Sequence, residues 1–406
     1  MNILLIAYCF GANRGSEPGV GWNVARELAH RGHNITVIST GKFYTENKEA
    51  IIKESIPIRL VTKDFPESRW IRSYKIWQAH IASIIQQEVQ NQKYDVIHHI
   101  TFNQYRGIKD VFYTDIPALI GPIGGAEVIP VSLFRYGSLP FWLKIKEFIR
   151  YIPWDSIPLI QRINKRSQPL SVLCSNQITA NRLTKGLFRV KGEVRIVPAI
   201  AINESEIYED LTPPTPNPYI LFDGGLSRPQ KGTWLMLGAI KHLWKQGLHI
   251  PIRIVGLTDK EKSIIHKKAA DVGIPQEALQ LYNFIPRPVM LKFMREAIIF
   301  LSTVFRDSGA MAQLEALAQG TRIVSLDIPS QLWLPTDMAS KVKVQSSRNA
   351  MEKEIARLLK KQIDSPSHSE EWNIRRIKFL KKYMTWESRV DLFESIYKKL
   401  TQARAY

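Results

Sequence analysis

The sequence has little cysteine and no long apolar run. Cys9 and Cys174 are the only cysteines among 406 residues, which excludes a disulfide framework and the paired spacing of a zinc site. No apolar stretch reaches the ~18 residues that span a bilayer. The opening "MNILLIAYCF" also has neither a basic leader nor a small-residue cleavage site. We therefore expect a cytoplasmic protein, either soluble or peripheral on the inner face of the membrane.

Acidic residues are scarce relative to basic ones. The chain has 37 Asp and Glu against 56 Lys and Arg, a formal net charge of +19, which favours anionic partners. It has no recognised nucleic-acid module, so we do not expect nucleic acid to be the partner. There is no D-x-D pair and no His, Cys and carboxylate cluster with metal-ligand spacing. We therefore expect no metal and no cofactor.

Apolar strand patterns alternate with helical patterns along the whole chain. Runs such as "NILLIA", "NITVIS" and "PALIG" precede residue 200, and "YILFDGG", "IPIRIVG" and "TRIVSL" follow it. This alternation is typical of parallel sheets with helices between the strands. The proline-rich "EDLTPPTPNP" suits a linker. The sequence thus predicts an α/β protein of two doubly wound domains, 1–205 and 206–380, facing a central cleft.

The first strand pattern leads into a glycine-bearing turn. "RGSEPGVGWNVARELAHRG" carries Gly19 and Gly21 ahead of an amphipathic helix, and such a turn can bring backbone amides close to a phosphate. Val24 stands at the third glycine position of the dinucleotide fingerprint, and no acidic residue ends the next strand. A nicotinamide enzyme is therefore disfavoured. A purely structural use of these glycines stays open.

Stronger signals come from the second half. "FDGGLSRPQKG" follows a strand and places Arg228 and Lys231 in a glycine-bearing loop, where they are candidates for phosphate contact. "FRDSGAMAQLEALAQG" opens a helix, with Asp307 and Glu315 separated by seven residues. Amides at a helix N-terminus favour a diphosphate, and a carboxylate further along can accept bonds from ribose hydroxyls. We assign these amides to Ser308, Gly309, Ala310 and Met311.

The chain resembles the retaining GT-B glycosyltransferases of family 4, the "glycosyl transferases group 1". The resemblance rests on "GSEPGVGW", "HHITFNQYR", "GPIGGAE", the "KG" after the first strand of the second domain, and "LEALAQGTRIVSL". It implies Rossmann-like domains, the first on the acceptor side and the second binding a nucleotide sugar. It also implies that the closing helix, 381–406, crosses back toward the first domain.

Three positions differ from the pattern of this family. Asp307 replaces the first Glu of its E-x7-E motif, and Gly225 stands where an arginine commonly binds the diphosphate. "IVGLTD" lacks the usual "GDGP"-like turn. Arg228, from the same loop, is then the candidate that replaces the missing arginine.

Five residues are candidates for the acceptor side. They follow two strand patterns of the first domain: His98, His99, Gly124, Gly125 and Glu127. An isolated histidine is more often a core or capping residue than a catalytic one. A glycine turn of structural purpose is an equal alternative for "GPIGGAE".

The segment "SLPFWLKIKEFIRYIPW" has the spacing of an amphipathic helix. Lys144, Lys146 and Arg150 lie off its apolar face, and interfacial aromatics accompany it. This combination suits an anionic membrane surface. Packing of the helix on its own sheet is an equally good alternative.

Together these patterns predict a metal-independent glycosyltransferase. Lys231 and Arg228 would stabilise the departing diphosphate, Asp307 would orient the donor sugar, and Glu315 would bind ribose, while the Gly19 and Gly21 loop closes from the first domain. The partners expected are a nucleoside diphosphate sugar and a glycan or lipid-linked acceptor, as in envelope, exopolysaccharide or glycolipid synthesis. The alternatives are a non-catalytic binding partner and a nucleotide-sugar isomerase on the same fold.

Overall fold

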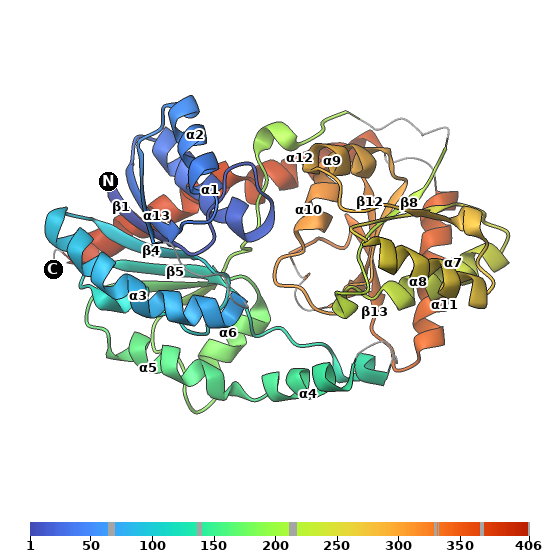
Figure 1. The fold of residues 1–406 in the computed structure, drawn as a ribbon, viewed down its shortest axis with the longest axis horizontal. Coiled ribbons are helices and arrows are strands. Elements are labelled where there is room, and N and C mark those ends of the chain that lie inside the picture. Colours follow the sequence, from blue (N-terminus) through green and yellow to red (C-terminus); the bar gives the residue numbers. More distant parts are fainter. Residues whose placement is uncertain are drawn as a thin grey trace. The chain divides into compact units, whose positions relative to one another are not determined.

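The computed structural model of the chain contains two compact units. It describes residues 1–63, 70–135, 140–210, 217–328, 331, 333–365 and 369–404. Unit 1 comprises Met1–Glu127, Ile152–Ala201 and Tyr383–Tyr406, and unit 2 comprises Val128–Tyr151 and Ile202–Lys382. Each unit is a helix-covered sheet (Figure 1).

Unit 1 is built on a seven-stranded sheet in the order β3-β2-β1-β4-β5-β6-β7. Every neighbouring pair is parallel. The strands are β1 (Asn2–Ala7), β2 (Asn34–Thr40), β3 (Ile58–Lys63), β4 (Val96–Thr101), β5 (Ala118–Ile123), β6 (Leu170–Cys174) and β7 (Val194–Ile196). The helices are α1 (Ser16–His30), α2 (Tyr44–Glu54), α3 (Trp70–Asn91), α5 (Ile157–Lys165), α6 (Gln177–Thr184) and α13 (Trp386–Arg404).

The strands of unit 1 are apolar on both faces because helices cover both. Along β1, Ile3 and Leu5 belong to one hydrophobic cluster, whereas Leu4 and Ile6 belong to another. The first cluster includes residues of α1 and α13, and the second includes residues of α3, α5 and α6. Continuous apolar runs are the usual signature of parallel strands that are buried in this way.

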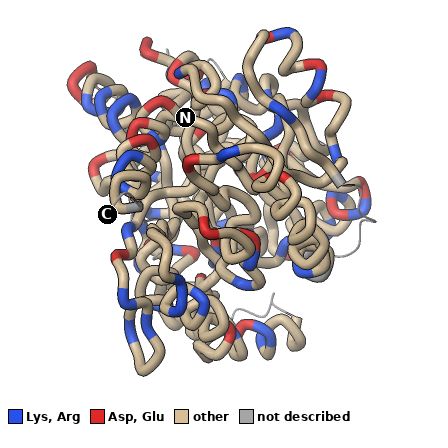
Figure 2. The backbone as a smooth tube through the Cα atoms, turned by 90° about the vertical axis from the view of Figure 1, so that its left-hand side faces the viewer, with Lys and Arg blue, Asp and Glu red and all other residues tan. Residues whose placement is uncertain are grey.

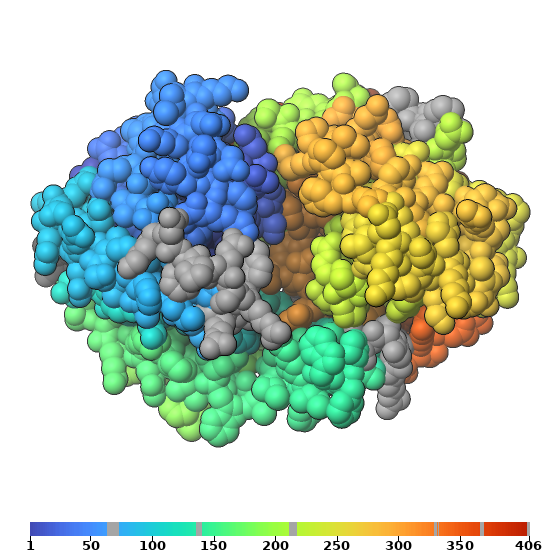
Figure 3. Space-filling view, viewed as in Figure 1, coloured from blue at the N-terminus to red at the C-terminus, as the bar shows by residue number. Residues whose placement is uncertain are grey.

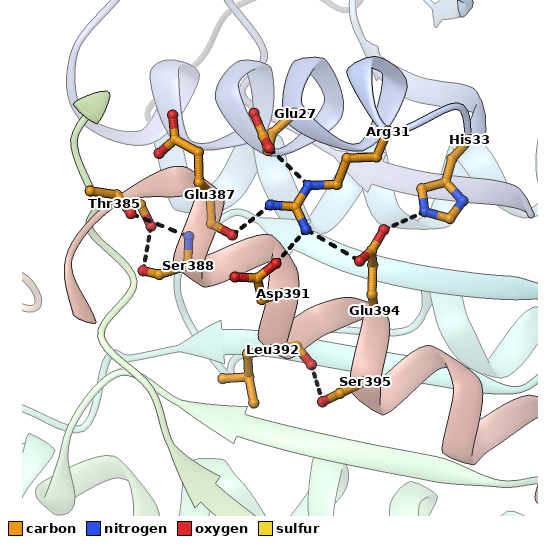
Figure 4. A network of polar contacts seen from close by, with 10 residues as sticks. All are labelled: Glu27, Arg31, His33, Thr385, Glu387, Ser388, Asp391, Leu392, Glu394 and Ser395. Atoms are coloured by element: carbon orange, nitrogen blue, oxygen red, sulfur yellow. Dashed lines mark hydrogen bonds and ion pairs between the residues drawn. The ribbon is translucent and has the colours of Figure 1, made fainter. Parts of the chain in front are cut away.

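The C-terminal helix α13 belongs to unit 1 and packs against α1. Figure 4 shows Arg31 at the end of α1 reaching Glu27, Asp391 and Glu394. The His33 Nε2 lies 2.7 Å from the second carboxylate oxygen of Glu394. This network joins residues more than 350 positions apart in the sequence, and it fixes the closing helix to the first unit.

Unit 2 repeats the same architecture with a six-stranded sheet in the order β10-β9-β8-β11-β12-β13. All pairs are again parallel. The strands are β8 (Ile220–Asp223), β9 (Ile252–Val255), β10 (Leu279–Leu281), β11 (Ile299–Ser302), β12 (Arg322–Asp327) and β13 (Ala339–Lys343). The helices are α4 (Phe141–Arg150), α7 (Thr233–Lys245), α8 (Asp259–Asp271), α9 (Arg287–Glu296), α10 (Met311–Ala318), α11 (Arg348–Asp364) and α12 (Glu370–Tyr383).

The predicted division of the chain differs from the observed units in one segment. Residues Val128–Tyr151, placed with the first domain by the sequence, belong to unit 2, and the chain returns to unit 2 at Ile202. Ile129, Leu133 and Leu143 explain the difference, because they are buried in the same hydrophobic cluster as β8 and α7. Most of the predicted linker, 211–216, lies outside the described residues.

Three whole-chain expectations can be compared with the structure. Cys9 and Cys174 are both free and buried. Among the described helices, none is long and apolar enough to cross a membrane. Figure 2 shows basic and acidic residues interspersed along the backbone.

Candidate functional site

The predicted residues of unit 2 flank the point where its strand order reverses. β8 is hydrogen-bonded to β9 on one side and to β11 on the other. Chain connections leave these strands in opposite directions at such a point, and ligands of doubly wound sheets bind there, outside the carboxyl ends of the strands. The loop 224–232 follows β8, and the loop 303–310 follows β11. The two loops that the sequence singles out are therefore neighbours.

Hydrogen bonds hold these two loops together. The Thr303 hydroxyl donates to the carbonyl oxygens of Lys231 and Gly232, at 3.0 Å each, and the Phe305 amide donates to the Gln230 carbonyl at 2.8 Å. Gly232 has φ +72°, and a Cβ there would lie 2.2 Å from the Thr303 carbonyl oxygen. Only glycine fits this close approach, and this explains why a glycine follows Lys231 in the "KG" dipeptide.

Both predicted cations face the same carboxylate, which the sequence reasoning missed. The Lys231 Nζ lies 2.8 Å from Asp223 Oδ2, and the Arg228 Nη2 lies 3.8 Å from Asp223 Oδ1. Asp223 is the last residue of β8. The three charges sum to +1, so the loop keeps a net positive charge beside the switch point. An arriving diphosphate would compete with Asp223 for the cations.

The loop after β8 is braced by Glu261 near the start of α8. Its carboxylate accepts the Ser227 amide at 2.6 Å and the Thr258 amide at 2.8 Å. Burial would raise the pKa of Glu261, but these hydrogen bonds lower it to about 2. A Cβ at Gly225 would lie 3.1 Å from Glu261 Oε1. A long side chain at position 225 would therefore crowd this brace, which accounts for glycine where the family commonly has arginine.

Asp307 and the start of α10 form the second half of the site. Asp307 Oδ1 accepts the Gly309 amide at 3.1 Å, closing a local turn. Ala310 follows in the left-handed region, at φ 53°, and Met311 begins the helix. A left-handed alanine costs about 1–2 kcal/mol. The turn aims the first-turn amides of α10, which have no carbonyl partner within the helix, out of the N-terminus.

Glu315 is held in an ion pair that the sequence did not indicate. Its Oε1 accepts Arg287 Nε at 2.8 Å, and the other end of the Arg287 guanidinium contacts both carboxylate oxygens of Glu206. Burial raises the pKa of Glu315, Arg287 opposes that shift, and Glu206 and Asp223 add to it. The negative charge of Asp223 thus acts on the pKa of Glu315, although the two residues belong to different elements.

This arrangement suits an anionic ligand with attached hydroxyls. The groups are the cations Lys231 and Arg228, the N-terminus of α10, and the carboxylates of Asp307 and Glu315. They come from segments that meet at the carboxyl ends of the strands. Cations and oriented amides stabilise phosphate charge, and the carboxylates accept hydroxyl protons. Among the residues that the structure describes, no group of three or more His, Cys, Asp or Glu side chains is arranged to hold a metal ion.

The structure corrects the prediction of a mobile glycine loop in unit 1. Gly19 and Gly21 lie inside α1, which begins at Ser16, and both are buried. A Cβ at Gly19 would lie 2.2 Å from the Arg14 carbonyl oxygen, and one at Gly21 would lie 2.8 Å from the Cys9 carbonyl oxygen. Their function in the fold is therefore to let α1 approach the end of β1 closely.

The first turn of α1 contains an acid, Glu17, that the sequence reasoning missed. Glu17 Oε1 accepts the Asn103 amide at 2.9 Å, and its buried Oε2 has no hydrogen-bond partner among the described residues. Burial raises the pKa of Glu17 to about 7. Glu17 is thus partly protonated near neutral pH, at the carboxyl ends of β1 and β4.

The two candidate histidines are both fully buried. His98 lies 2.6 Å from the Tyr397 hydroxyl and 2.6 Å from the Gly121 carbonyl oxygen, and burial lowers its pKa to about 3. His99 Nδ1 pairs with Asp110 at 2.7 Å. His98 therefore links α13 to the sheet through its two hydrogen bonds. His99 lies within β4 and packs against the ring of Tyr74 on α3. These contacts favour the structural alternative for both.

The acceptor-side candidates after β5 form a buried polar cluster. Glu127 accepts the Gly125 amide at 2.8 Å and the Asn176 side-chain amide, and Asn176 caps α6. Gly125 has φ +103°, and a Cβ at Gly124 would lie 2.8 Å from the Ser175 hydroxyl oxygen. These residues join the end of β5 to α6, which favours the structural reading of "GPIGGAE".

Sequence signals for the residues that were missed are weak. Asp223 could have been suspected because it ends an apolar strand next to the "GG" of the loop. Arg287 and Glu206 carry no such signal, since they are 81 positions apart and only the fold brings them together.

Comparisons with known proteins bear on the family and the fold of the chain. Residues 203–376, all within unit 2, match the family model "Glycosyl transferases group 1". The predicted resemblance to the glycosyl transferases group 1 is confirmed over these residues. No curated protein matches the chain.

Solved structures resemble the chain over its whole length. A glycosyltransferase from Rickettsia africae is 14% identical, with 98% of each chain covered and a TM-score of 0.64. WaaG, a glycosyltransferase involved in lipopolysaccharide biosynthesis, is 12% identical, with 96% of this chain and 99% of that one covered and a TM-score of 0.62. HepE from Anabaena in complex with UDP-glucose is 10% identical, with 100% and 99% covered and a TM-score of 0.59. These structures confirm the predicted GT-B type of fold, and the family model supports glycosyl transfer in general.

Proposed function

We propose that the chain transfers a sugar from a nucleoside diphosphate sugar to an acceptor hydroxyl, with retention at the anomeric carbon and without a bound metal. The observation that carries the proposal is the meeting of Lys231, Arg228 and the N-terminus of α10 at the switch point of unit 2. The nucleotide sugar bound by the similar HepE structure adds support.

Each residue has a role that follows from its place. Lys231 and Arg228 leave Asp223 for the diphosphate and stabilise its charge as the sugar departs. Glu315, held by Arg287, accepts bonds from the ribose hydroxyls. Asp307 projects from the turn before α10 and orients the donor sugar.

Retention requires no side-chain nucleophile in this scheme. The leaving phosphate accepts the proton of the acceptor hydroxyl on the face from which the acceptor attacks. Cations and amides neutralise the leaving group, so no divalent ion is needed. The acceptor is a glycan or a lipid-linked glycan, and the protein works as a peripheral enzyme at the inner face of a membrane.

The proposal is tested by incubating the protein with a panel of sugar nucleotides and measuring released nucleoside diphosphate. We expect release from at least one donor, abolished by Lys231→Ala and retained by Lys267→Ala, an exposed lysine of α8. A thermal-shift screen with the same panel measures binding separately, because a ligand of the folded state stabilises it.

The result also separates the alternatives. Binding without release would favour a non-catalytic partner, and conversion of the donor sugar without an acceptor would favour an isomerase. If no sugar nucleotide is bound or consumed, the donor-site assignment is wrong.

A further inference from the structure

Helix α4 exposes its apolar side and buries its only acid. Phe141, Trp142, Phe148 and Ile149 are 78%, 62%, 64% and 60% exposed, and Ile145 is exposed as well. In a helix these positions share one side, since residues three, four and seven apart lie above one another. Figure 3 shows this helix at the molecular surface. An exposed aromatic stripe of this size is typical of an interaction surface.

The opposite side of α4 is fixed to unit 2. Leu143 is buried in the main hydrophobic cluster of that unit. Glu147, four residues later, is fully buried, and its Oε2 accepts the Ile129 amide at 3.2 Å. The inward side of the helix is therefore held by a leucine and a carboxylate, and the outward apolar side stays exposed.

The exposed part of the helix carries only positive charge. Lys144 and Lys146 are its unburied lysines, whereas the one acid, Glu147, is buried and Arg150 pairs with it. Aromatic side chains flanked by cations suit the boundary between lipid headgroups and acyl chains. This charge complementarity selects an anionic bilayer surface as the occupant, rather than a second copy of the same basic chain.

The buried carboxylate also reaches the candidate site. Glu147 Oε1 has no hydrogen bond, but Arg306 Nη1 and Arg150 Nε each lie 3.4 Å from it. Arg306 directly precedes Asp307 in the loop between β11 and α10. A buried carboxylate that loses its cation is left uncompensated at a high free-energy cost, so Glu147 and Arg306 should move together. A movement of α4 would thus displace Arg306 and the loop 303–310, which contains Asp307.

We propose that the outward face of α4 docks on an anionic lipid bilayer and that the Glu147–Arg306 ion pair transmits docking to the Asp307 loop. Glu147 is then a positioning residue. The significance of the loop rests on the proposed function, whereas the docking does not. Transfer to a lipid-linked acceptor would in this way be favoured at the surface where that acceptor resides.

Docking is tested by co-sedimentation of the full chain with vesicles. We expect binding at low salt to vesicles of phosphatidylcholine and phosphatidylglycerol, but not to phosphatidylcholine alone. The double variant Phe148→Ser and Ile149→Ser should lower the bound fraction on the order of tenfold or more. Lys144→Glu with Lys146→Glu should weaken it and remove its salt dependence. Phe284→Ser removes an aromatic elsewhere in unit 2 that is even more exposed than Phe148, and this variant should bind as wild type does.

Transmission is tested by hydrogen exchange of the segment 303–311. Anionic vesicles should slow its exchange in the wild type and leave it unchanged in Glu147→Gln, which keeps an acceptor for the Ile129 amide but loses the charge. Glu147→Gln should still bind vesicles.

Several results would overturn the inference. One is no binding to anionic vesicles, and another is equal slowing of the segment in Glu147→Gln. A dimer that the Phe148 and Ile149 variant dissociates, without vesicle binding, would identify the face as a contact between copies. Neither readout uses a donor, so an absence of donor turnover would contradict only the proposed function.

Discussion

The ion pair of Glu315 allows a sharp test of the donor site, because Arg287 binds two carboxylates of which only one should contact the ligand. Glu315 lies on α10 and accepts Arg287 Nε, whereas Glu206 accepts the far end of the same guanidinium. Glu315→Gln and Glu206→Gln are nearly isosteric changes that each remove one negative charge from Arg287. If neither acid contacts the donor, the two variants should bind the donor with equal affinity.

The expected losses follow from the contacts. A hydrogen bond to a charged group contributes about 1.5–3 kcal/mol, and each variant leaves Arg287 with one carboxylate. Both should therefore lose unfolding free energy, and Glu206→Gln should lose more, because Glu206 accepts two bonds from Arg287 and Glu315 accepts one. Only Glu315→Gln should also lose the charged acceptor for the ribose hydroxyls. A further ~1.5–3 kcal/mol there corresponds to a donor affinity that is roughly ten- to 150-fold weaker.

The measurements are urea denaturation for stability and isothermal titration with the best donor for affinity. We expect Glu206→Gln to bind the donor within about threefold of wild type, a difference below 1 kcal/mol. Equal donor affinities in the two variants, both folded under the conditions of the titration, would refute the assignment of Glu315 to the ligand. Weaker binding in Glu206→Gln alone would refute it as well.

Four other predictions follow from particular contacts. Gly232→Ala should lower the unfolding free energy by about 3 kcal/mol or more, because its Cβ would lie 2.2 Å from the Thr303 carbonyl oxygen. Gly247→Ala, which is also at positive φ but has open space around its Cβ, should lower it by only about 1 kcal/mol. Equal losses in urea denaturation would contradict this prediction. Burial raises the pKa of Glu17 to about 7, so its protonated form stabilises the fold fully below its unfolded pKa, and this contribution is lost as the pH rises through 7. The wild type should therefore lose up to about 3 kcal/mol relative to Glu17→Gln between pH 4.5 and 8, and a constant difference would count against the buried acid. Asp307→Ala should lower kcat on the order of tenfold or more with donor KM little changed, and an unaltered kcat would remove Asp307 from the site. Activity should persist in excess chelator, and activity restored only by Mg²⁺ or Mn²⁺ would show that a metal is required.

The sequence by itself determined the architecture, because parallel strands covered on both faces must be apolar throughout. Strands such as Asn2–Ala7 and Ile299–Ser302 are short apolar runs for this reason, and their alternation with helices predicts two sheets. It also identified the loops after β8 and β11, since glycine, cations and a helix start are local features. Arg228, Lys231, Asp307 and Glu315 were accessible in this way.

The tertiary structure alone decided which residues these loops meet. Asp223 faces Lys231, and Arg287 joins Glu206 to Glu315, because the strand order brings distant segments to one edge. It also decided the direction of α4, since periodicity gives a helix an apolar side but does not say what covers it. Here Leu143 and Glu147 face the unit because Ile129 and Arg306 offer them partners, and the aromatic side is therefore left exposed.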